Sequence, residues 1–385
     1  MTAGLSDLYA IPQELEDFRA AIRQIAQERI APRAGEIDRT GSYPWDVREL
    51  LAEHDVFALP FAEQHGGTGT GTLMLQMAVE QIAAACATSA LMLMVQELGT
   101  LPIQRFGSEQ MRARVLPRCA TGEWAPAFAL SEAEAGSDPA AMRTNARREG
   151  DEWVIDGEKT WITNAGIADF YVVFATTDRA ARRITAFLVE RERPGVSVGA
   201  LERKLGIKGS PTGSPVFDGV RVPDENVIGE VGEGLAVALA TLERTRLGAA
   251  AQAVGIAQGA IDCANTYARE RVAFGQPINR LQGIQFKLAD METGTAAARE
   301  LLYKACALAD RPRPPADLGK WTSMAKLLAS DNAMRVTVEA VQVLGGYGYV
   351  NDYPLERMMR DAKITQIYEG TNEIQRVVIA RAMAR

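Results

Sequence analysis

The clearest indication of the fold lies in residues 170–189, which read FYVVFATTDRAARRITAFLV. Two runs of β-branched and aromatic residues, at 170–174 and 184–189, flank a short polar connection. Such runs suit a pleated, half-buried surface, so they predict two strands that pair across the connection. The rest of the chain is organised around this β segment.

The segment before this pair supports the same architecture. It reads WVI at residues 153–155, and Gly150-Asp151 and Asp156-Gly157 beside it have the composition of hairpin turns. Because short apolar runs alternate with turn residues, we expect consecutive strands joined by tight turns. From about residue 124 to residue 233 the sequence therefore predicts an antiparallel β domain.

Both flanking regions show helical periodicity. Apolar residues recur at spacings of three, four and seven, which places them on one buried stripe of a helix. Three long helices and a shorter one in the last third predict an antiparallel bundle. The expected helices are a buried core helix at 73–95, a long helix over 239–267, helices at 281–308 and 321–344, and a last helix after Gly370 with Thr371 as N-cap and Glu373 in its first turn. The fold class is α+β multi-domain, with domains expected at 1–123, 124–233 and 234–385.

Length and charge exclude several functions. A chain of 385 residues is long enough for two or three sub-domains. Its net charge of -7 argues against the basic face that nucleic-acid binding needs. The chain has 2 histidines, His54 and His65, which disfavours a Ser-His-Asp triad or a histidine-rich metal centre. Acid–base chemistry is therefore expected from a carboxylate.

The cysteines and the N-terminus favour a cytoplasmic protein. Residues 1–13 lack a basic segment followed by an apolar one, so no signal peptide is expected. The apolar run at 73–95 is interrupted by polar residues and predicts no membrane span. The cysteines form no C-x-x-C pair and are expected to be small buried residues rather than metal ligands; they are Cys86, Cys119, Cys263 and Cys306.

A first candidate site is FALSEAEAGSD at residues 128–138, where a strand runs into a Gly-Ser-Asp turn. Free backbone N–H groups and the hydroxyls of Ser131 and Ser137 would suit a pyrophosphate or the edge of a flavin ring. An ordinary strand–loop turn is the alternative. No G-x-G-x-x-G follows a strand and no Walker motif is present, so a Rossmann enzyme is disfavoured and the glycines at 66–71 are expected to form a plain loop.

Two further motifs combine aromatic and polar residues. WITN at 161–164 would place Trp161 and Thr163 on one face of a strand as a flavin wall, with a core tryptophan as the alternative. RVAFGQPI at 271–278 interrupts two long helices. There Arg271 could pair with a phosphate and Phe274 could lie against a planar ring, or the segment could be a solvated turn.

The last two motifs lie near the C-terminus. QVLGGYGY at 342–349 ends a long helix with glycines that would let its backbone approach a ligand. IYEGTNEIQR at 367–376 places Glu369 in apolar company just before a helix start. Burial there would raise the pKa of this carboxyl towards the range useful to a general base.

In this order and spacing, the five segments resemble the acyl-CoA dehydrogenase family. The resemblance covers residues 10–383 and includes PFAEQHGG at 60–67 and KLGIKGS at 204–210. It implies an N-terminal helical domain, a middle β domain and a C-terminal four-helix bundle, in agreement with the helical, β and helical regions predicted above. It also implies a flavoprotein of fatty acid metabolism, a homotetramer or dimer, and FAD bound between the β domain and the bundle with help from a neighbouring subunit.

The resemblance assigns individual residues to the cofactor and the substrate. Thr163 is expected near flavin N5, while Arg271 and its neighbours are expected to reach the FAD of a partner subunit. The positions assigned to FAD are Phe128, Leu130, Ser131, Gly136, Ser137, Trp161, Thr163, Arg271, Phe274, Gln282, Gln342, Gly345, Gly346, Thr371 and Glu373. Those assigned to the acyl-CoA are Ser137, Glu243, Arg246, Tyr368 and Gly370, with a solvated helix face as the alternative for Glu243 and Arg246.

Glu369 matches the family's catalytic base. The resemblance implies that it removes the α-proton of an acyl-CoA thioester while flavin N5 accepts the β-hydride, which gives a trans-2-enoyl-CoA. The backbone N–H of Glu369 and a ribityl hydroxyl of the flavin are expected to stabilise the enolate oxygen. A family variant places the base at the position of Thr245, and a threonine there leaves the role to Glu369. Ala133 stands where many relatives have proline.

The acyl group is less sharply defined. Residues 89–102, including Met92, Met94, Leu98 and Leu101, match the wall of the acyl pocket and contain no arginine to hold a second carboxylate. A short, medium or branched acyl chain is therefore expected, with electron-transfer flavoprotein as electron acceptor. The alternatives are an acyl-CoA oxidase or related flavoenzyme on the same fold, and a non-catalytic binding protein of acyl-CoA dehydrogenase type.

Overall fold

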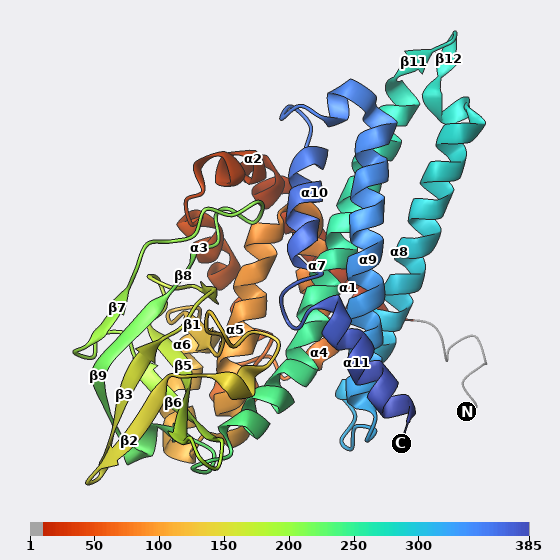
Figure 1. Ribbon diagram of the computed structural model, residues 1–385. Coiled ribbons are helices and arrows are strands. Elements are labelled where there is room, and N and C mark those ends of the chain that lie inside the picture. Colours follow the sequence, from red (N-terminus) through yellow and green to blue (C-terminus); the bar gives the residue numbers. More distant parts are fainter. Residues whose placement is uncertain (1–10, 385) are drawn as a thin grey trace.

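The computed structural model describes residues 11–384, in which helices, a β-sheet and further helices follow one another along the chain (Figure 1). The expected absence of a signal peptide concerns residues 1–13, of which 1–10 lie outside the described residues. The helices before the sheet are α1 (Gln13–Ile25), α2 (Ala31–Thr40), α3 (Trp45–Glu53), α4 (Gly71–Ala85), α5 (Ala87–Phe106) and α6 (Glu109–Ala120). Those after it are α7 (Gly234–Glu270), α8 (Gln282–Ala309), α9 (Leu318–Leu344), α10 (Leu355–Ile364) and α11 (Asn372–Met383).

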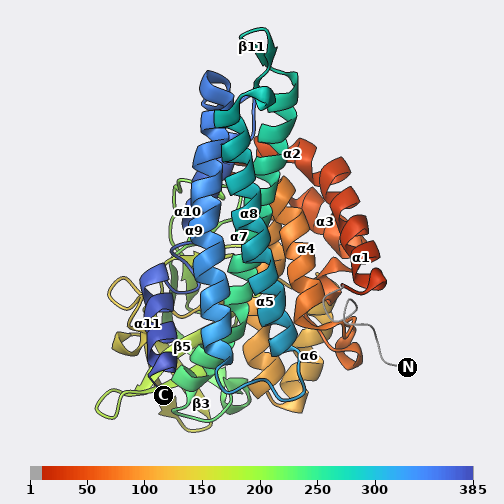
Figure 2. The same cartoon turned by 90° about the vertical axis from the view of Figure 1, so that its right-hand side faces the viewer.

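The two helical parts share one hydrophobic core. α4 and α5 pack against α7, which also packs against α8 and α9 (Figure 2). α7 buries a run of small residues, and at Gly255 a Cβ atom would lie 2.2 Å from the carbonyl oxygen of Glu80 on α4. Such close approach of helices depends on residues without a side chain. The predicted C-terminal bundle is confirmed, and α10 and α11 complete it against α9.

The helix predicted over 73–95 is in fact two helices, so this prediction is wrong in one respect. α4 ends at Ala85 and α5 begins at Ala87, because Cys86 has an extended backbone with φ -155° and ψ 110°. Thr88 and Ser89 follow the break, and hydroxyl side chains compete for backbone hydrogen bonds and disfavour a continuous helix. Apolar character alone conceals the break, since both helices are buried on most sides.

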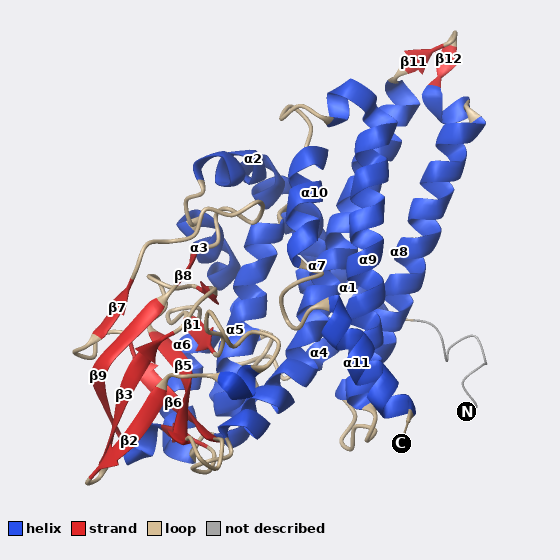
Figure 3. Ribbon diagram, viewed as in Figure 1, coloured by secondary structure: helices blue, strands red, loops and turns tan. Residues whose placement is uncertain are grey.

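The middle region forms a twisted eight-stranded sheet beside the helices, together with a separate two-stranded sheet of β4 and β8 (Figure 3). The main path of the sheet is β10-β6-β5-β2-β3-β9-β7, and β1 also pairs with β5. The two strands predicted within residues 170–189 are β5 and β6, which pair antiparallel as predicted. The sheet is mostly antiparallel, but β1 runs parallel to β5 and β2 shares one parallel bridge with it. The strands are β1 (Pro126–Ala129), β2 (Asn145–Glu149), β3 (Glu152–Glu158), β4 (Ile162–Thr163), β5 (Phe170–Asp178), β6 (Arg183–Glu190), β7 (Val196–Val198), β8 (Thr212–Gly213), β9 (Pro215–Pro223) and β10 (Val227–Ile228).

Of the two predicted hairpin turns, one is confirmed and one is wrong. Gly150 and Asp151 join β2 to β3, where Glu149 pairs with Glu152. Asp156-Gly157 lies inside β3, at a register shift against β9. A Cβ on Gly157 would lie 2.6 Å from Thr144, so close packing at a bulge, and not a turn, requires glycine there.

Within residues 11–384 no helix is long and apolar enough to cross a membrane. The same residues hold no group of three or more side chains placed to bind a metal ion. Cys86, Cys119 and Cys306 are buried, Cys263 is partly buried, and all four are free thiols.

Candidate active site

Glu369 lies in a tight turn between α10 and α11. Glu369 and the next residue, Gly370, both have left-handed backbones, with φ of +56° and +85°. This conformation costs a non-glycine residue on the order of 1–3 kcal/mol, and such strain clusters at functional sites. The predicted N-cap is confirmed, because the Thr371 side chain accepts a hydrogen bond from the N–H of Ile374 as α11 begins.

Neighbouring helices fix the side chains of this turn. The Thr245 hydroxyl on α7 donates to Oε2 of Glu369 over 3.0 Å. The Tyr368 hydroxyl donates to Oε1 of Gln252. Gln252 also donates to the carbonyl of Ala87 at the start of α5, over 2.8 Å. The turn is thus tied to α7 and, through Gln252, to the N-terminal helices.

The Glu369 carboxyl lies among opposing electrostatic influences. Burial raises its pKa above the ordinary value, while the hydrogen bond from Thr245 and the charges of Arg246 and Lys326 lower it. The net effect is a raised pKa. A carboxylate with a raised pKa is a stronger base, as proton abstraction from carbon requires.

Sequence reasoning missed the polar groups behind the turn. Nε2 of Gln375 donates to the carbonyls of Glu369, over 3.1 Å, and Gly370, over 2.8 Å. Nζ of Lys326, on α9, donates to the same Gly370 carbonyl over 2.8 Å. The available signal was the phase of Lys326, a lone lysine on the buried stripe of α9 that also contains Ala329.

Arg246 faces the protein interior. The alternative of a solvated helix face is wrong for this residue, whose exposed fraction is 8%. Its guanidinium donates to the carbonyl of Leu242 over 2.9 Å, to the Ser323 hydroxyl, and to Oε1 of Gln375 over 3.1 Å. Buried arginines need such partners, and these orient the cation beside the Glu369 turn.

A buried ion pair helps to join the segment at 128–138 to the strand end that precedes residues 161–164. Lys159 has an exposed fraction of 0% and donates to Glu132 over 2.7 Å and to the carbonyl of Leu130 over 3.2 Å. The N–H of Thr160 donates to the carbonyl of Ser131 over 2.9 Å. The 128–138 segment is therefore fastened to the strand end that leads to Trp161 and Thr163.

Trp161 differs from both interpretations of its motif. It precedes β4 with a left-handed backbone (φ +64°), so strand alternation does not place it on one face with Thr163. It is not a core tryptophan, because 61% of it is exposed. The N–H groups of Gly136 and Ser137 make no hydrogen bond to another described residue. An exposed aromatic ring and free backbone donors are the kinds of groups that contact the ring and the phosphates of FAD.

The motifs at 271–278 and 342–349 meet at one end of the bundle, at the top of Figure 1. The guanidinium of Arg271 lies over the ring of Tyr347 at 5.9 Å. The hairpin β11 (Val272–Ala273) and β12 (Gln276–Pro277) presents Phe274, which is 92% exposed and has φ +52°. α7 rises about 39 Å between Thr245 and Arg271 at 1.5 Å per residue, so this end is remote from Glu369 in the same chain.

The remaining cofactor and substrate positions divide between these regions. Gln282, Gln342, Gly345 and Gly346 are exposed at the hairpin end. Thr371 and Glu373 belong to the Glu369 turn and α11, and Phe128 packs on Phe174 with ring centroids 4.9 Å apart. The structure therefore brings Glu369, Tyr368, Gly370 and Arg246 together, but it does not bring the hairpin to them.

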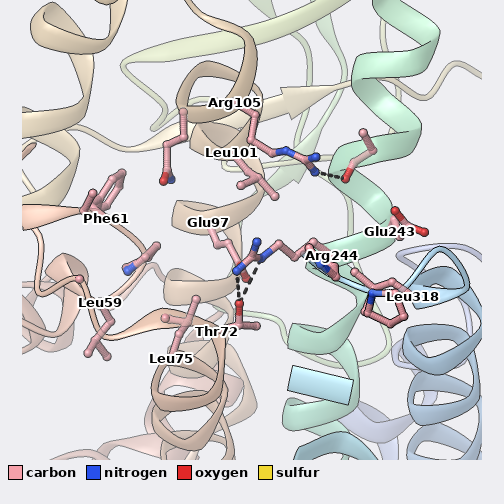
Figure 4. Close-up of a pocket in the computed structure, with 18 of the residues that line it drawn as sticks. Leu59, Phe61, Thr72, Leu75, Glu97, Leu101, Arg105, Glu243, Arg244 and Leu318 are labelled. Atoms are coloured by element: carbon pink, nitrogen blue, oxygen red, sulfur yellow. Dashed lines mark hydrogen bonds between the residues drawn. The ribbon is translucent and has the colours of Figure 1, made fainter. Parts of the chain in front are cut away.

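A cavity of about 630 Å³ opens between α4, α5, α7 and the loop before α9 (Figure 4). Leu101, an expected acyl-pocket residue, and Glu243, an expected CoA contact, both line it. Arg244 points across it and donates to Thr72 and Asp310. Glu97 also lines the cavity and is only 4% exposed. Burial raises the pKa of Glu97 to about 7, although the charge of Arg244 and a hydrogen bond from Gln76 lower it. Sequence reasoning did not identify this buried carboxyl within an apolar helix.

Comparison with known proteins identifies the class of this chain. Residues 12–123, 127–220 and 232–384 match the N-terminal, middle and C-terminal domains of acyl-CoA dehydrogenase. The chain therefore belongs to the acyl-CoA dehydrogenase family. It is an oxidoreductase that acts on acyl-CoA, and its cofactor is FAD, as in the flavoproteins of this family.

Individual relatives match over nearly the whole chain. The probable acyl-CoA dehydrogenase FadE25 of Mycobacterium tuberculosis is 47% identical over 381 residues, which cover 98% of this chain and 97% of that protein. The short-chain specific acyl-CoA dehydrogenase of Mus musculus mitochondria is 43% identical over 378 residues, which cover 97% and 91%.

Solved structures agree with this classification. Butyryl-CoA dehydrogenase of Megasphaera elsdenii has a TM-score of 0.94 and 41% identity, covering 98% of this chain and 100% of that one. A chain in a structure of the electron transferring flavoprotein of Acidaminococcus fermentans has a TM-score of 0.95 and 39% identity, covering 98% and 99%. A glutaryl-CoA dehydrogenase of Mycobacterium smegmatis in complex with FADH2 has a TM-score of 0.91 and 29% identity, covering 97% and 95%.

Proposed function

We propose that this enzyme converts a short-chain acyl-CoA to the trans-2-enoyl-CoA, with Glu369 removing the α-proton. The observation that best supports this role is the Glu369 carboxyl itself, which is held by Thr245 over 3.0 Å and has a pKa raised by burial. When bound, FAD supplies the acceptor for the β-hydride at N5. The protein's task is then to hold the thioester, the base and the cofactor in line.

The backbone of the same turn has a second role in this proposal. The N–H of Glu369 makes no hydrogen bond to another described residue, while Gln375 holds the carbonyls of Glu369 and Gly370. With the carbonyls held on the α11 side, this N–H is free to donate to the thioester oxygen as negative charge develops there. A fixed donor of this kind lowers the barrier because it needs no reorganisation during the reaction.

A short, monocarboxylic acyl group fits the surroundings of the site. Short-chain and butyryl-CoA dehydrogenases are among the most similar proteins. Both arginines that line the cavity already have partners: the guanidinium of Arg244 donates to Asp310 and Thr72, and that of Arg105 donates to the carbonyl of Ala240. A second substrate carboxylate there would also approach Glu97. We further propose an electron-transfer flavoprotein as electron acceptor and a homotetramer or dimer as the assembly.

Anaerobic flavin bleaching tests this function. The purified yellow holoprotein is mixed without oxygen with acyl-CoA thioesters of increasing length, branched acyl-CoAs and glutaryl-CoA. We expect bleaching to be fastest with butyryl-CoA or a near neighbour. Acetyl-CoA is the control, because it has no β-carbon from which a hydride can leave. Absence of bleaching with every thioester would contradict the proposal, and peroxide formed in air as fast as substrate is consumed would indicate an oxidase.

A further inference from the structure

Lys326 is a fully buried cation next to the catalytic turn. It lies on α9 with an exposed fraction of 0%. Its Nζ donates to the carbonyl of Gly370 and to Oδ1 of Asn372, each over 2.8 Å. Neither acceptor carries a charge, and burial of an ammonium group among neutral partners costs several kcal/mol in general.

Hydrogen bonding alone does not explain a lysine at this position. Gln375 already donates to the Gly370 carbonyl over 2.8 Å, and it is a neutral side chain. Asn372 is likewise engaged by Ser330, and it donates to Asp331. Lys326 therefore contributes its positive charge, which is held at the carbonyl of Gly370, the residue that follows Glu369.

We propose that Lys326 is a positioning residue whose charge keeps the Glu369 carboxylate ionised, and whose bond to the Gly370 carbonyl fixes the turn that carries it. The proposal rests on the role of Glu369 as the base. It assigns to Lys326 no contact with substrate or cofactor. Its effect is to set the pH range over which the base is ready to accept a proton.

The charges around both groups agree with this assignment. Burial lowers the pKa of Lys326 to about 7, and the charge of Arg246 also lowers it. The charge of Glu369 is the strongest influence that raises this pKa, and the charges of Asp331 and Glu373 raise it further. Three groups near Glu369 favour its ionised form: the Thr245 hydroxyl and the Arg246 cation on α7, and the Lys326 cation on α9. The carboxyl of Glu97 on α5 interacts with Glu369 in the opposite sense. Lys326 and Glu369 therefore titrate as a coupled pair.

The test is the pH dependence of anaerobic flavin reduction by saturating butyryl-CoA. Removing a nearby cation raises a carboxyl pKa by about one unit or more, so in Lys326→Met the acid limb of the rate profile should move about one unit to higher pH. Lys326→Arg keeps the charge and should keep the wild-type limb. Lys287→Met is the matched control, because it removes a half-exposed lysine whose ion pair with Glu339 joins α8 to α9.

The outcomes separate a charge effect from a structural one. A rate lowered by the same factor at every pH, with the acid limb unmoved, would overturn the proposal. If Lys326→Met does not bind FAD, then Lys326→Gln, which retains hydrogen bonding without charge, should show the same shift of the limb, and an unmoved limb there also overturns it. A Glu369→Gln variant that still reduces its flavin would instead contradict the role of Glu369, whatever the lysine variants show.

Discussion

The Glu369 turn and the β11–β12 hairpin both carry sequence motifs, but the turn is bound to neighbouring helices and the hairpin is exposed. Glu369 and Gly370 of the turn accept hydrogen bonds from Gln375, Lys326 and Thr245. The hairpin extends from the end of the bundle and leaves Phe274 92% exposed on a strained backbone. The difference indicates that the proposed base, Glu369, is preorganised within one chain. The hairpin is remote from Glu369, and we propose that it contacts a second copy of the chain.

The largest expected effect is on turnover, at the turn. Glu369→Gln removes the base while keeping the shape of the side chain, and a positioned base contributes about 10²–10⁴-fold. We expect a loss towards the upper end of this range, with FAD retained, as measured by steady-state oxidation of butyryl-CoA. Glu300→Gln is the control, because Glu300 is an exposed carboxylate on α8 and the variant should turn over normally. Loss of FAD together with activity would contradict the assignment of a purely chemical role.

The next effect is on stability, inside the β domain. Glu132→Ala leaves Lys159 as a buried uncompensated cation and frees the N–H groups of Arg143 and Thr144, which donate to Glu132. Breaking a buried pair in this way costs about 3–5 kcal/mol of unfolding free energy. Urea unfolding measures this cost. Glu132→Ala combined with Lys159→Met should recover part of it, and a double variant no more stable than Glu132→Ala alone would show that the charge is not the cause.

A pH-dependent stability effect is expected at Glu97, beside the turn. Burial raises the pKa of Glu97 from an ordinary 4.5 to about 7, so between these values the folded protein binds more protons than the unfolded chain. Unfolding free energy from this group therefore falls as pH rises through that window. Glu97→Gln should be more stable than the wild type at pH 8 by about 3 kcal/mol and no more stable at pH 4. Equal differences at the two pH values would contradict the raised pKa.

The smallest effect on stability is expected at the hairpin. Phe274→Ala removes an exposed ring, so the stability of the single chain should change by less than about 0.5 kcal/mol. FAD affinity should nevertheless fall about tenfold, and the mass in solution should shift towards smaller species, if the ring contacts the FAD site of a neighbouring copy as we propose. Equilibrium dialysis and light scattering measure these quantities. Trp45→Ala, at another exposed aromatic, is the control, and unchanged FAD affinity in Phe274→Ala would place the hairpin outside the cofactor site.

The sequence allowed prediction where a local pattern has a local cause. The β5–β6 pair and the Thr371 cap follow from residue types next to one another, and both are confirmed. The Asp156-Gly157 bulge was missed because the close approach of Thr144 decides it, and the Cys86 break was missed because both helices beside it are buried and apolar. The pair Asp156-Gly157 has the composition of a turn, and only its close contact with Thr144 shows why a glycine is needed inside the strand.

The site shows the same division. Glu369 was proposed from its motif, but its environment depends on Thr245 of α7 and Lys326 of α9, which lie more than forty residues away along the chain. Burial of Arg246, Lys159 and Lys326 reverses the usual expectation that long charged side chains are solvated. Sequence position alone could not give these contacts, although a charge on an apolar stripe was a usable signal for Lys326.

The claim that Glu369 removes the α-proton can be tested apart from flavin reduction. An acyl-CoA whose β-carbon is replaced by sulfur has no β-hydride to lose, so only proton removal remains. The holoenzyme is incubated with it in D₂O, and deuterium at the α-carbon is measured by mass spectrometry. We predict that the wild type exchanges the α-hydrogens and that Glu369→Gln does not. Exchange by Glu369→Gln at the wild-type rate would contradict the account.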